Sequence, residues 1–385
     1  MKKVLHICNH DFYLIKFLKP IILEQLNNGY EVHVVCKIND PNFKFFDGVK
    51  IHNISYPISF FSVLKLIKSI GDMVFIIKKN NFFIVISHNR IASFVGRIAS
   101  YICRIPIRIY FAHGFYFHDD QNKISKFITI QLERLLSKIT SYTLSQSIED
   151  LNFMTKLNYI KKNKISYVGN GIDEKKFSPV LEKNLLREKL DLPTDSFLIC
   201  AVGRLVKGKG FQDLIRAFSI YNKKDKNSYL IIVGGNVAQD ISKYENKILR
   251  MTKKLGIKDH IIMTGMVNNV QEYLGCSNVF VSASYREGIS KSMLEAMNME
   301  IPVVVSNIRG SREVIQDEFN GLLFKSKDFL ELSQKLIYVK NNIEIAKKIS
   351  KNARNLVQSF FTEKKYTKRQ IDIFKKISEQ TIKSS

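Results

Sequence analysis

Short apolar runs and longer helical patterns alternate along most of the chain, and this alternation limits the fold more than any other feature. In the first part of the chain, the apolar runs that predict β-strands are residues 3–8, 31–36, 82–87, 107–112 and 141–146. Helical patterns lie between them, near residues 14–28, 60–79, 91–103 and 123–138. Because strands joined by helices of this length form right-handed crossovers, the pattern predicts a largely parallel sheet with helices on both faces.

The segment "YVGNGIDEKKFSPV" (167–180) interrupts this alternation with glycines and a proline, and we place a domain joint there. The alternation then resumes, with strands predicted at residues 197–203, 229–235, 260–265, 278–284, 301–306 and 321–324. The sequence therefore predicts an α/β fold of two doubly wound, Rossmann-like domains, residues 1–170 and 171–360, facing an interdomain crevice at the carboxyl ends of their strands. A basic amphipathic helix is predicted at 361–377, and we expect residues 361–385 to pack back on the first domain.

The charge of the chain favours anionic partners. Its 385 residues include 60 Lys and Arg against 35 Asp and Glu, a net charge of +25, which suits nucleotides, nucleic acid or anionic lipid. The basic residues form no single dense stripe and no nucleic-acid-binding motif is present, so we expect no nucleic-acid partner. The 5 cysteines include no C-x-x-C pair, which is typical of reduced thiols in the cytosol.

No part of the sequence predicts a membrane span. The longest uncharged gap in its apolar regions, "IHNISYPISFFSVL" (51–64), is shorter than the ~18–20 residues that cross a bilayer. Residues 60–79 combine Phe and Ile with four lysines, as an interfacial helix does, although a packed helix with its lysines outward is an equal alternative. We expect a cytoplasmic protein that binds anionic lipid peripherally, on the inner face of the cell membrane.

The segment "VGRLVKGKG" (202–210) directly follows the first strand of the second domain. It places Gly203 and Arg204 before a basic turn that contains Lys209 and Gly210, and a helical pattern begins after it. Two cations and a glycine turn at a strand-to-helix junction suit a diphosphate, because Arg204 can bind two phosphate oxygens and Lys209 supplies a point charge. The P-loop pattern G-x-x-x-x-G-K-[ST] is absent. On this motif alone, a solvated basic turn is an equal alternative.

The stretch "YREGISKSMLEAM" (285–297) places Glu287 and Glu295 on the two sides of a loop-to-helix junction. A helix that begins near Ser290 directs its amino end, with its unpaired amides, toward the carboxyl ends of the strands and can hold negative charge. Glu287, in the loop, can accept hydrogen bonds from sugar hydroxyls. Glu295 lies a little over one turn into the helix and can bind both hydroxyls of a ribose. Taken alone, such a spacing is more often a surface glutamate and an ordinary helix glutamate.

Together, these motifs resemble the retaining glycosyltransferases of the GT-B fold, the family called glycosyl transferase group 1. Glu287 and Glu295 match the family's E-x7-E pattern, and "GRLVKGKG" (203–210) matches its G-R-L-x-x-x-K-G pattern. "NGIDEKKF" (170–177) resembles the interdomain signature of the family, and "NIRGSREVIQDEFNGLLF" (307–324) resembles the block that follows. The similarity covers nearly the whole chain and is closest to members that build capsular, O-antigen and lipid-linked oligosaccharides.

The resemblance implies a role for each candidate site residue. Arg204 and Lys209 would neutralise the diphosphate of a nucleotide-sugar, and Glu295 would hold its ribose. His113, in "AHGF" (112–115), would contact the donor sugar or the leaving phosphate. The implied catalytic residues are His113, Arg204, Lys209 and Glu287. The implied nucleotide-sugar-binding residues are Gly203, Arg204, Lys209, Val270, Glu287, Gly288, Ile289, Ser290 and Glu295.

The reaction implied by the resemblance moves a hexose or N-acetylhexosamine, with retention, from a UDP-linked donor to a saccharide on a polyprenyl diphosphate. We expect no cofactor and no metal ion, because the sequence contains no D-x-D triplet and Asp119–Asp120 is a weak metal candidate. Two other classes stay open at this point. A GT-B sugar-nucleotide epimerase would act without a lipid acceptor, and a basic nucleic-acid-binding protein would bind generic DNA in a salt-sensitive way.

Overall fold

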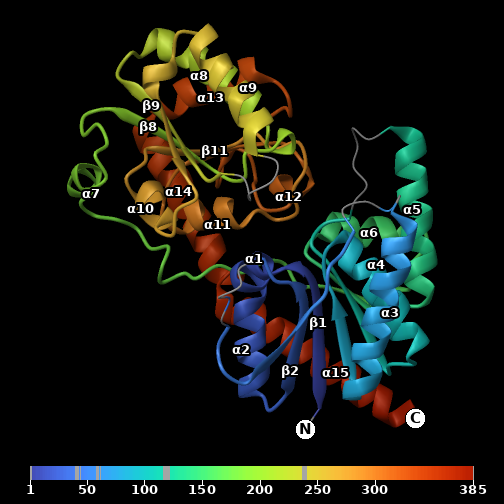
Figure 1. Cartoon of the computed structure of the whole chain (residues 1–385). Coiled ribbons are helices and arrows are strands. Elements are labelled where there is room, and N and C mark those ends of the chain that lie inside the picture. Colours follow the sequence, from blue (N-terminus) through green and yellow to red (C-terminus); the bar gives the residue numbers. More distant parts are fainter. Residues whose placement is uncertain are drawn as a thin grey trace. The chain divides into compact units, whose positions relative to one another are not determined.

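The computed structural model describes residues 2–39, 43, 45–57, 60, 62–115, 122–235 and 241–384. The chain forms two compact units (Figure 1). Unit 1 consists of Met1–Gly169 and Lys364–Ser385, and unit 2 consists of Asn170–Glu363. The chain therefore leaves unit 1 within the segment where the sequence predicts a joint, and it returns to unit 1 for its last helix.

Unit 1 is built on a parallel sheet of the order β3-β2-β1-β4-β5-β6-β7. Its strands are β1 (Lys3–His10), β2 (Glu31–Lys37), β3 (Val49–Asn53), β4 (Ile84–Ser87), β5 (Ile107–Ala112), β6 (Tyr142–Ser145) and β7 (Ile165–Tyr167). The order of the strands reverses at β1, which pairs with β2 on one side and with β4 on the other. Ligands of such sheets bind at this reversal, beyond the carboxyl ends of the strands.

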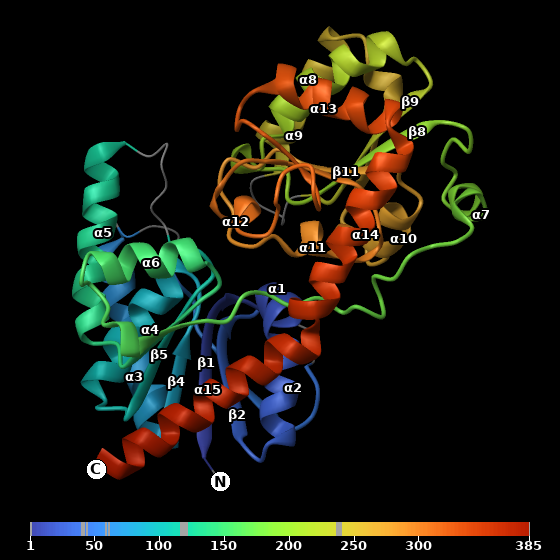
Figure 2. The ribbon, with the colours of Figure 1, turned by 180° about the vertical axis from the view of Figure 1, so that it is seen from behind.

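Helices cover both faces of this sheet. They are α1 (Asp11–Tyr13), η1 (Leu14–Leu18), α2 (Lys19–Asn27), α3 (Val63–Asn80), α4 (Arg90–Ile102), α5 (Lys123–Lys138), α6 (Ile148–Lys156), η2 (Lys162–Lys164) and α15 (Glu363–Ser384). On one face, apolar side chains of α2 and α15 form a single cluster with those of the strands, and Figure 2 shows α15 running across this face. On the other face, α3 and α4 bury Met73 and Val95 against β1 and β4.

Unit 2 repeats this design with a parallel sheet of the order β10-β9-β8-β11-β12-β13. Its strands are β8 (Phe197–Val202), β9 (Ser228–Val233), β10 (Ile261–Gly265), β11 (Val279–Ser282), β12 (Val303–Ser306) and β13 (Leu322–Phe324). Its helices are α7 (Lys183–Lys189), η3 (Lys207–Lys209), α8 (Phe211–Lys224), α9 (Ile241–Lys254), η4 (Lys258–His260), α10 (Val270–Gly275), α11 (Lys291–Asn298), α12 (Arg309–Arg312), α13 (Phe329–Asn341) and α14 (Ile343–Phe360). The order reverses at β8, so the loops after β8 and β11 leave the sheet side by side.

The predicted α/β fold of two doubly wound parallel sheets is confirmed, and every strand that the sequence predicts is present. The prediction missed β3, β7 and α6. Among the helices that the structure describes, none combines the length and the hydropathy needed to cross a membrane.

Candidate functional site

Two loops of unit 2 pack against each other at the carboxyl ends of β8 and β11. The Tyr285 amide in the second loop donates a hydrogen bond to the Gly208 carbonyl in the first, at 2.9 Å. Gly210 has a left-handed backbone with φ of +67°, and a Cβ at this position would lie 1.9 Å from the Ala283 carbonyl oxygen. Only glycine satisfies both conditions, because other residues avoid positive φ and carry the Cβ that would collide. The turn predicted from the sequence thus brings the two candidate motifs together.

The side chains of Lys209 and Glu287 form an ion pair across these loops. The Ser284 hydroxyl also donates to Glu287 Oε1, at 3.2 Å. The sequence predicted both residues but assigned them to different parts of a ligand, so this contact was not expected. With side chains 22% and 21% exposed, the pair is reachable from solvent. An incoming phosphate can therefore share the ammonium of Lys209, which has three N–H donors.

Arg204 is exposed on the loop that follows β8, beside Gly203. Its guanidinium makes no hydrogen bond or ion pair within the part of the chain that the structure describes, while Gly203 extends β8 by donating its amide to the Val233 carbonyl at 2.9 Å. The site loop therefore presents Lys209, whose charge is balanced by a carboxylate, and Arg204, whose charge is available to an anionic ligand.

The segment from Gly288 to Ser290 is fixed by contacts that sequence reasoning did not predict. The side-chain amide of Asn170 donates to the Ile289 carbonyl at 2.8 Å, and Ile289 itself is buried. A Cβ at Gly310 would lie 1.8 Å from the Gly288 carbonyl oxygen, so α12 can approach this loop only through a glycine. Both residues stand in family-like blocks of the sequence, "NGID" and "NIRGSR", which were the available signal.

The remaining predicted residues of unit 2 lie on two short helices or directly before one of them. Ser290 precedes α11 as its N-cap residue, and its hydroxyl lies 3.1 Å from that of Ser292. Glu295 is half-buried in the middle of α11. Val270 is the first residue of α10, which follows β10 at the outer side of the sheet. The predicted residues of unit 2 thus all follow the carboxyl ends of β8, β10 and β11.

His113 lies in unit 1, directly after β5. Its Nε2 atom contacts the Tyr13 hydroxyl and lies 3.2 Å from His88 Nδ1. The ring stacks on Phe111, with 4.4 Å between the ring centroids. Burial lowers the pKa of His113 to about 3, so the ring is neutral near pH 7. Sequence reasoning predicted His113 but not Tyr13 or His88, which lie far from it in the chain.

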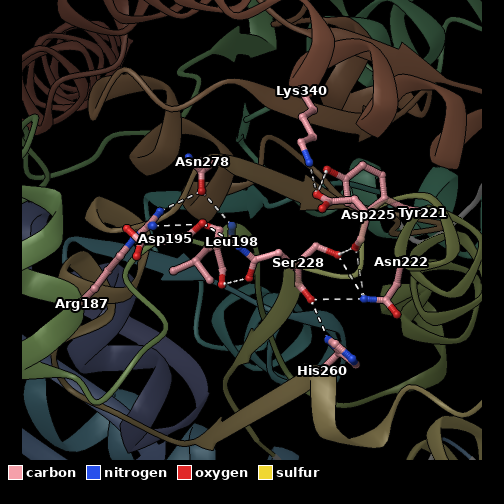
Figure 3. Close-up of polar contacts among 12 residues, drawn as sticks. Arg187, Asp195, Leu198, Tyr221, Asn222, Asp225, Ser228, His260, Asn278 and Lys340 are labelled. Carbon is pink, nitrogen blue, oxygen red and sulfur yellow. Dashed lines mark hydrogen bonds and ion pairs between the residues drawn. The ribbon is translucent and has the colours of Figure 1, made fainter.

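A cavity of about 330 Å³ lies at the opposite, amino end of the unit 2 strands, where Figure 3 shows its polar contacts. Arg187 of α7 donates from Nε to the Cys276 carbonyl at 3.0 Å and from an Nη atom to Asn278 Oδ1 at 2.8 Å. Lys340 of α13 forms an ion pair with Asp225. These groups use their hydrogen-bonding capacity to join α7 and α13 to the sheet, which is a structural role.

No group of three or more His, Cys, Asp or Glu side chains that could hold a metal ion occurs among the residues that the structure describes. The candidate pair Asp119–Asp120 lies outside these residues.

Two family models match this chain. The model described as "Glycosyl transferases group 1" matches residues 182–356, and the model described as "Glycosyltransferase Family 4" matches residues 21–176.

Similar proteins cover nearly the full length of the chain. An Escherichia coli protein named UDP-Gal:alpha-D-GlcNAc-diphosphoundecaprenol alpha-1,3-galactosyltransferase is 29% identical, over 87% of this chain and 86% of the relative. The Staphylococcus aureus capsular polysaccharide biosynthesis glycosyltransferase CapM is also 29% identical, over 91% and 93%. Among solved structures, Anabaena HepE in complex with UDP-glucose has a TM-score of 0.78 at 16% identity and covers 98% of this chain and 100% of its own. That likeness shows the fold.

Proposed function

The chain belongs to the GT-B glycosyltransferases, and from this premise we propose that it moves a hexose or N-acetylhexosamine from a UDP-sugar to a lipid-linked saccharide, with retention of anomeric configuration. The reaction would be a step in the synthesis of a bacterial surface polysaccharide. The observation that carries the proposal is the pair of packed loops after β8 and β11, which present Arg204, Lys209 and Glu287 at one edge of the unit 2 sheet.

The chemistry of these side chains supports a nucleotide-sugar donor. Arg204 and Lys209 stabilise the diphosphate that leaves, which removes the need for a metal ion at this step. Glu295 binds the ribose hydroxyls, while Glu287 and the backbone of residues 288–290 contact the sugar. The departing phosphate accepts the proton of the acceptor hydroxyl on the same face of the sugar, so that no side-chain base is required.

Relatives support the choice of donor and acceptor. The Escherichia coli relative is named for UDP-Gal and for an acceptor on diphosphoundecaprenol. A Campylobacter jejuni relative, 24% identical, is named for transfer of N-acetylgalactosamine to a diphospho-undecaprenol-linked sugar. The Anabaena structure contains UDP-glucose. We assign the same classes of donor and acceptor to this chain.

A screen of sugar nucleotides tests this function. Thermal unfolding is measured with UDP-, GDP- and dTDP-sugars, each with EDTA, and we expect a UDP-sugar to raise the midpoint. The stabilising donor is then incubated with polyprenyl-diphosphate saccharides, and the products are identified by mass spectrometry. Loss of transfer in EDTA with recovery in Mg²⁺ would contradict metal independence. Release of an epimerised sugar without lipid product would instead identify an epimerase.

The lipid acceptor also requires contact with a membrane, and we assign this contact to one face of unit 1. The helices α3, α4 and α5 cover that face, and α4 contacts both of its neighbours. Leu64 and Phe75 on α3 are 84% and 68% exposed, and Ile124 and Phe127 on α5 are 71% and 62% exposed. Lysines interrupt both helices, so the face combines apolar side chains with the charge that anionic lipid attracts.

Vesicle flotation tests this membrane surface. We expect binding to phosphatidylglycerol vesicles, weak binding to phosphatidylcholine vesicles, and release in high salt. Phe127→Ser should reduce the bound fraction several-fold. Leu181→Ser is the matched control, because Leu181 is 96% exposed in unit 2. An equal effect of both substitutions would exclude this face, and retention through salt and carbonate washes would exclude peripheral binding.

A further inference from the structure

Three histidines from distant parts of the chain form a hydrogen-bonded series inside unit 1. His6 Nδ1 lies 3.0 Å from His88 Nε2, and His88 Nδ1 lies 3.2 Å from His113 Nε2. His6 is on β1, while His88 and His113 directly follow β4 and β5. The rings of His6 and His88 are parallel within 11°. The series therefore runs between adjacent strands toward the carboxyl edge of the sheet.

The deep end of the series is an amide. His6 Nε2 lies 2.8 Å from Gln25 Oε1 on α2, and the Gln25 side chain is completely buried. The outer end is His113, which is only half-buried and also contacts the Tyr13 hydroxyl and Gln146. Gln25 Oε1 and the ring nitrogens that it anchors keep a fixed geometry, because water cannot replace a lost partner in the buried interior.

All three imidazoles are neutral near pH 7. Burial lowers the pKa of His6 to about 4 and that of His113 to about 3, and it holds the pKa of His88 well below its usual value. A neutral imidazole has one N–H donor and one acceptor nitrogen. In a series of such rings, the tautomer of each ring therefore determines the tautomer of the next.

We propose that His88 and His6 are positioning residues that hold His113 in one neutral tautomer, with the direction of the series set by Gln25. Because Gln25 Oε1 accepts from His6 Nε2–H, His6 Nδ1 accepts from His88 Nε2–H. His88 Nδ1 then accepts from His113 Nε2–H. The Tyr13 hydroxyl, which contacts the same nitrogen, also accepts from His113 Nε2–H, and His113 Nδ1 becomes an acceptor to which a side-chain N–H of Gln146 or a hydroxyl of the sugar can donate. This inference rests on the proposed function, since it assigns His113 a part in transfer.

Nitrogen-15 NMR of histidine-labelled protein tests the tautomers without an activity assay. We expect His6, His88 and His113 to show the Nε2–H tautomer, with signals that stay constant from pH 8 to pH 5.5. In His88→Leu, the His113 signals should change to a mixture of tautomers, still without titration in this range because the ring stays buried. His88→Asn keeps an acceptor in the place of Nδ1 and should restore the single tautomer of His113.

Two further variants keep the test decisive. Gln25→Met removes the acceptor at the deep end and retains the shape of the side chain, so it should also give a tautomer mixture at His113 if His88→Leu does not fold. His33→Leu is the matched control, because His33 is buried in the same sheet and pairs with His52 at 3.0 Å, outside the series. It should leave the His113 signals unchanged.

Transfer kinetics separate this inference from the proposed function. We expect His88→Leu to lower kcat about 10-fold, with unchanged affinity for UDP, and His88→Asn to recover most of this loss. Among the described residues, Tyr13 is the titratable group outside the series whose ring contacts both His88 and His113. Unchanged His113 signals in folded His88→Leu and Gln25→Met would overturn the positioning role. Changed signals with an unchanged kcat would instead remove His113 from the reaction.

Discussion

At the scale of single residues, Gly210 determines whether the two site loops can meet. Its backbone has φ of +67°, and its missing side chain leaves the space that the Ala283 carbonyl occupies. Gly256 has almost the same backbone, with φ of +68°, but nothing lies within 4 Å of the position of its Cβ. The two glycines therefore separate the cost of a left-handed backbone from the cost of a collision.

We predict that Gly256→Ala lowers the free energy of unfolding by ~1–2 kcal/mol, the cost of a left-handed backbone for alanine, and leaves UDP affinity unchanged. Gly210→Ala should cost more and should weaken UDP at least 10-fold, because the loops must separate. Urea unfolding and calorimetric titration with UDP measure the two effects. Equal results for both variants would mean that the contact with Ala283 does not matter for the site.

The two glutamates of the site occupy different surroundings and should have different tasks. Glu295→Gln, on α11, should weaken both UDP and UDP-sugar about 10-fold, which corresponds to ~1.4 kcal/mol. Glu287→Gln should retain UDP affinity, because the loss of its charge leaves Lys209 free for phosphate, but should lower transfer about 100-fold. Calorimetry and product assays on both variants measure this. If both variants bind and react like the parent, the eight-residue spacing is a coincidence.

At the scale of helices and strands, the sequence predicted the elements that carry a continuous apolar pattern. β3 was missed because it is an edge strand whose residues, "VKIHN", are partly exposed and alternate with polar side chains. β7 is only 3 residues long and ends at Tyr167, where the segment interpreted as a joint begins. α6 was missed because only Asp150 and Met154 of its residues are buried, which leaves a weak apolar period.

The α4 and α5 helices are joined by a buried ion pair. Arg97, 2% exposed, donates to both carboxylate oxygens of Glu133 at 3.0 Å, and its guanidinium lies 4.0 Å from the centre of the Tyr110 ring. Arginine is suited to this place because its planar group binds a carboxylate at two points and stacks on an aromatic ring.

We predict that Arg97→Met lowers the free energy of unfolding by about 3–5 kcal/mol, because it leaves the Glu133 carboxylate buried and unpaired. Adding Glu133→Leu should recover part of this loss. Lys347→Ala is the control, since Lys347 pairs with Glu344 on the surface, where solvent screens the charges, and it should leave the stability nearly unchanged. Denaturant unfolding of the parent, Arg97→Met, the double variant and Lys347→Ala measures these differences in stability. A double variant less stable than Arg97→Met would show that burial of the charge is not the cause.

At the scale of the whole molecule, contacts between distant segments complete both the candidate site and the core. Lys209 and Glu287 are separated by 78 positions, and His6 and His88 by 82. In unit 2, the cation motif after β8 and the two-glutamate motif after β11 could be found from local spacing, because each motif directly follows a strand. The histidine series has no such local signal, because only the pairing of β1 with β4 and of β4 with β5 places its members together.

α15 contributes to unit 1 although it follows unit 2 in the sequence. We predict that Phe374→Ala, at a position 1% exposed, lowers the stability of unit 1 by about 3–5 kcal/mol, the usual cost of a deleted core aromatic. Hydrogen exchange should show faster opening of β1 and β2 amides, with β8 and β11 unaffected. Phe75→Ala is the control, because Phe75 is 68% exposed on α3. It should change neither the stability of unit 1 nor the hydrogen exchange of its amides. Equal protection of β1 in Phe374→Ala and the parent would exclude this role of α15.

The order in which the ribosome makes the chain gives this arrangement a further consequence. Residues 1–169 are synthesised first, but Tyr366, Ile371 and Phe374, which share their apolar cluster with β1 and β2, come after all of residues 170–363. At the usual rate of about 5–20 residues per second, translation of that intervening stretch takes roughly 10–40 s. Throughout this interval the nascent first unit carries an apolar face that α2 covers only in part. Molecular chaperones that bind such faces therefore have a defined period in which to act on this protein. This period ends when α15 emerges from the ribosome and packs on the face.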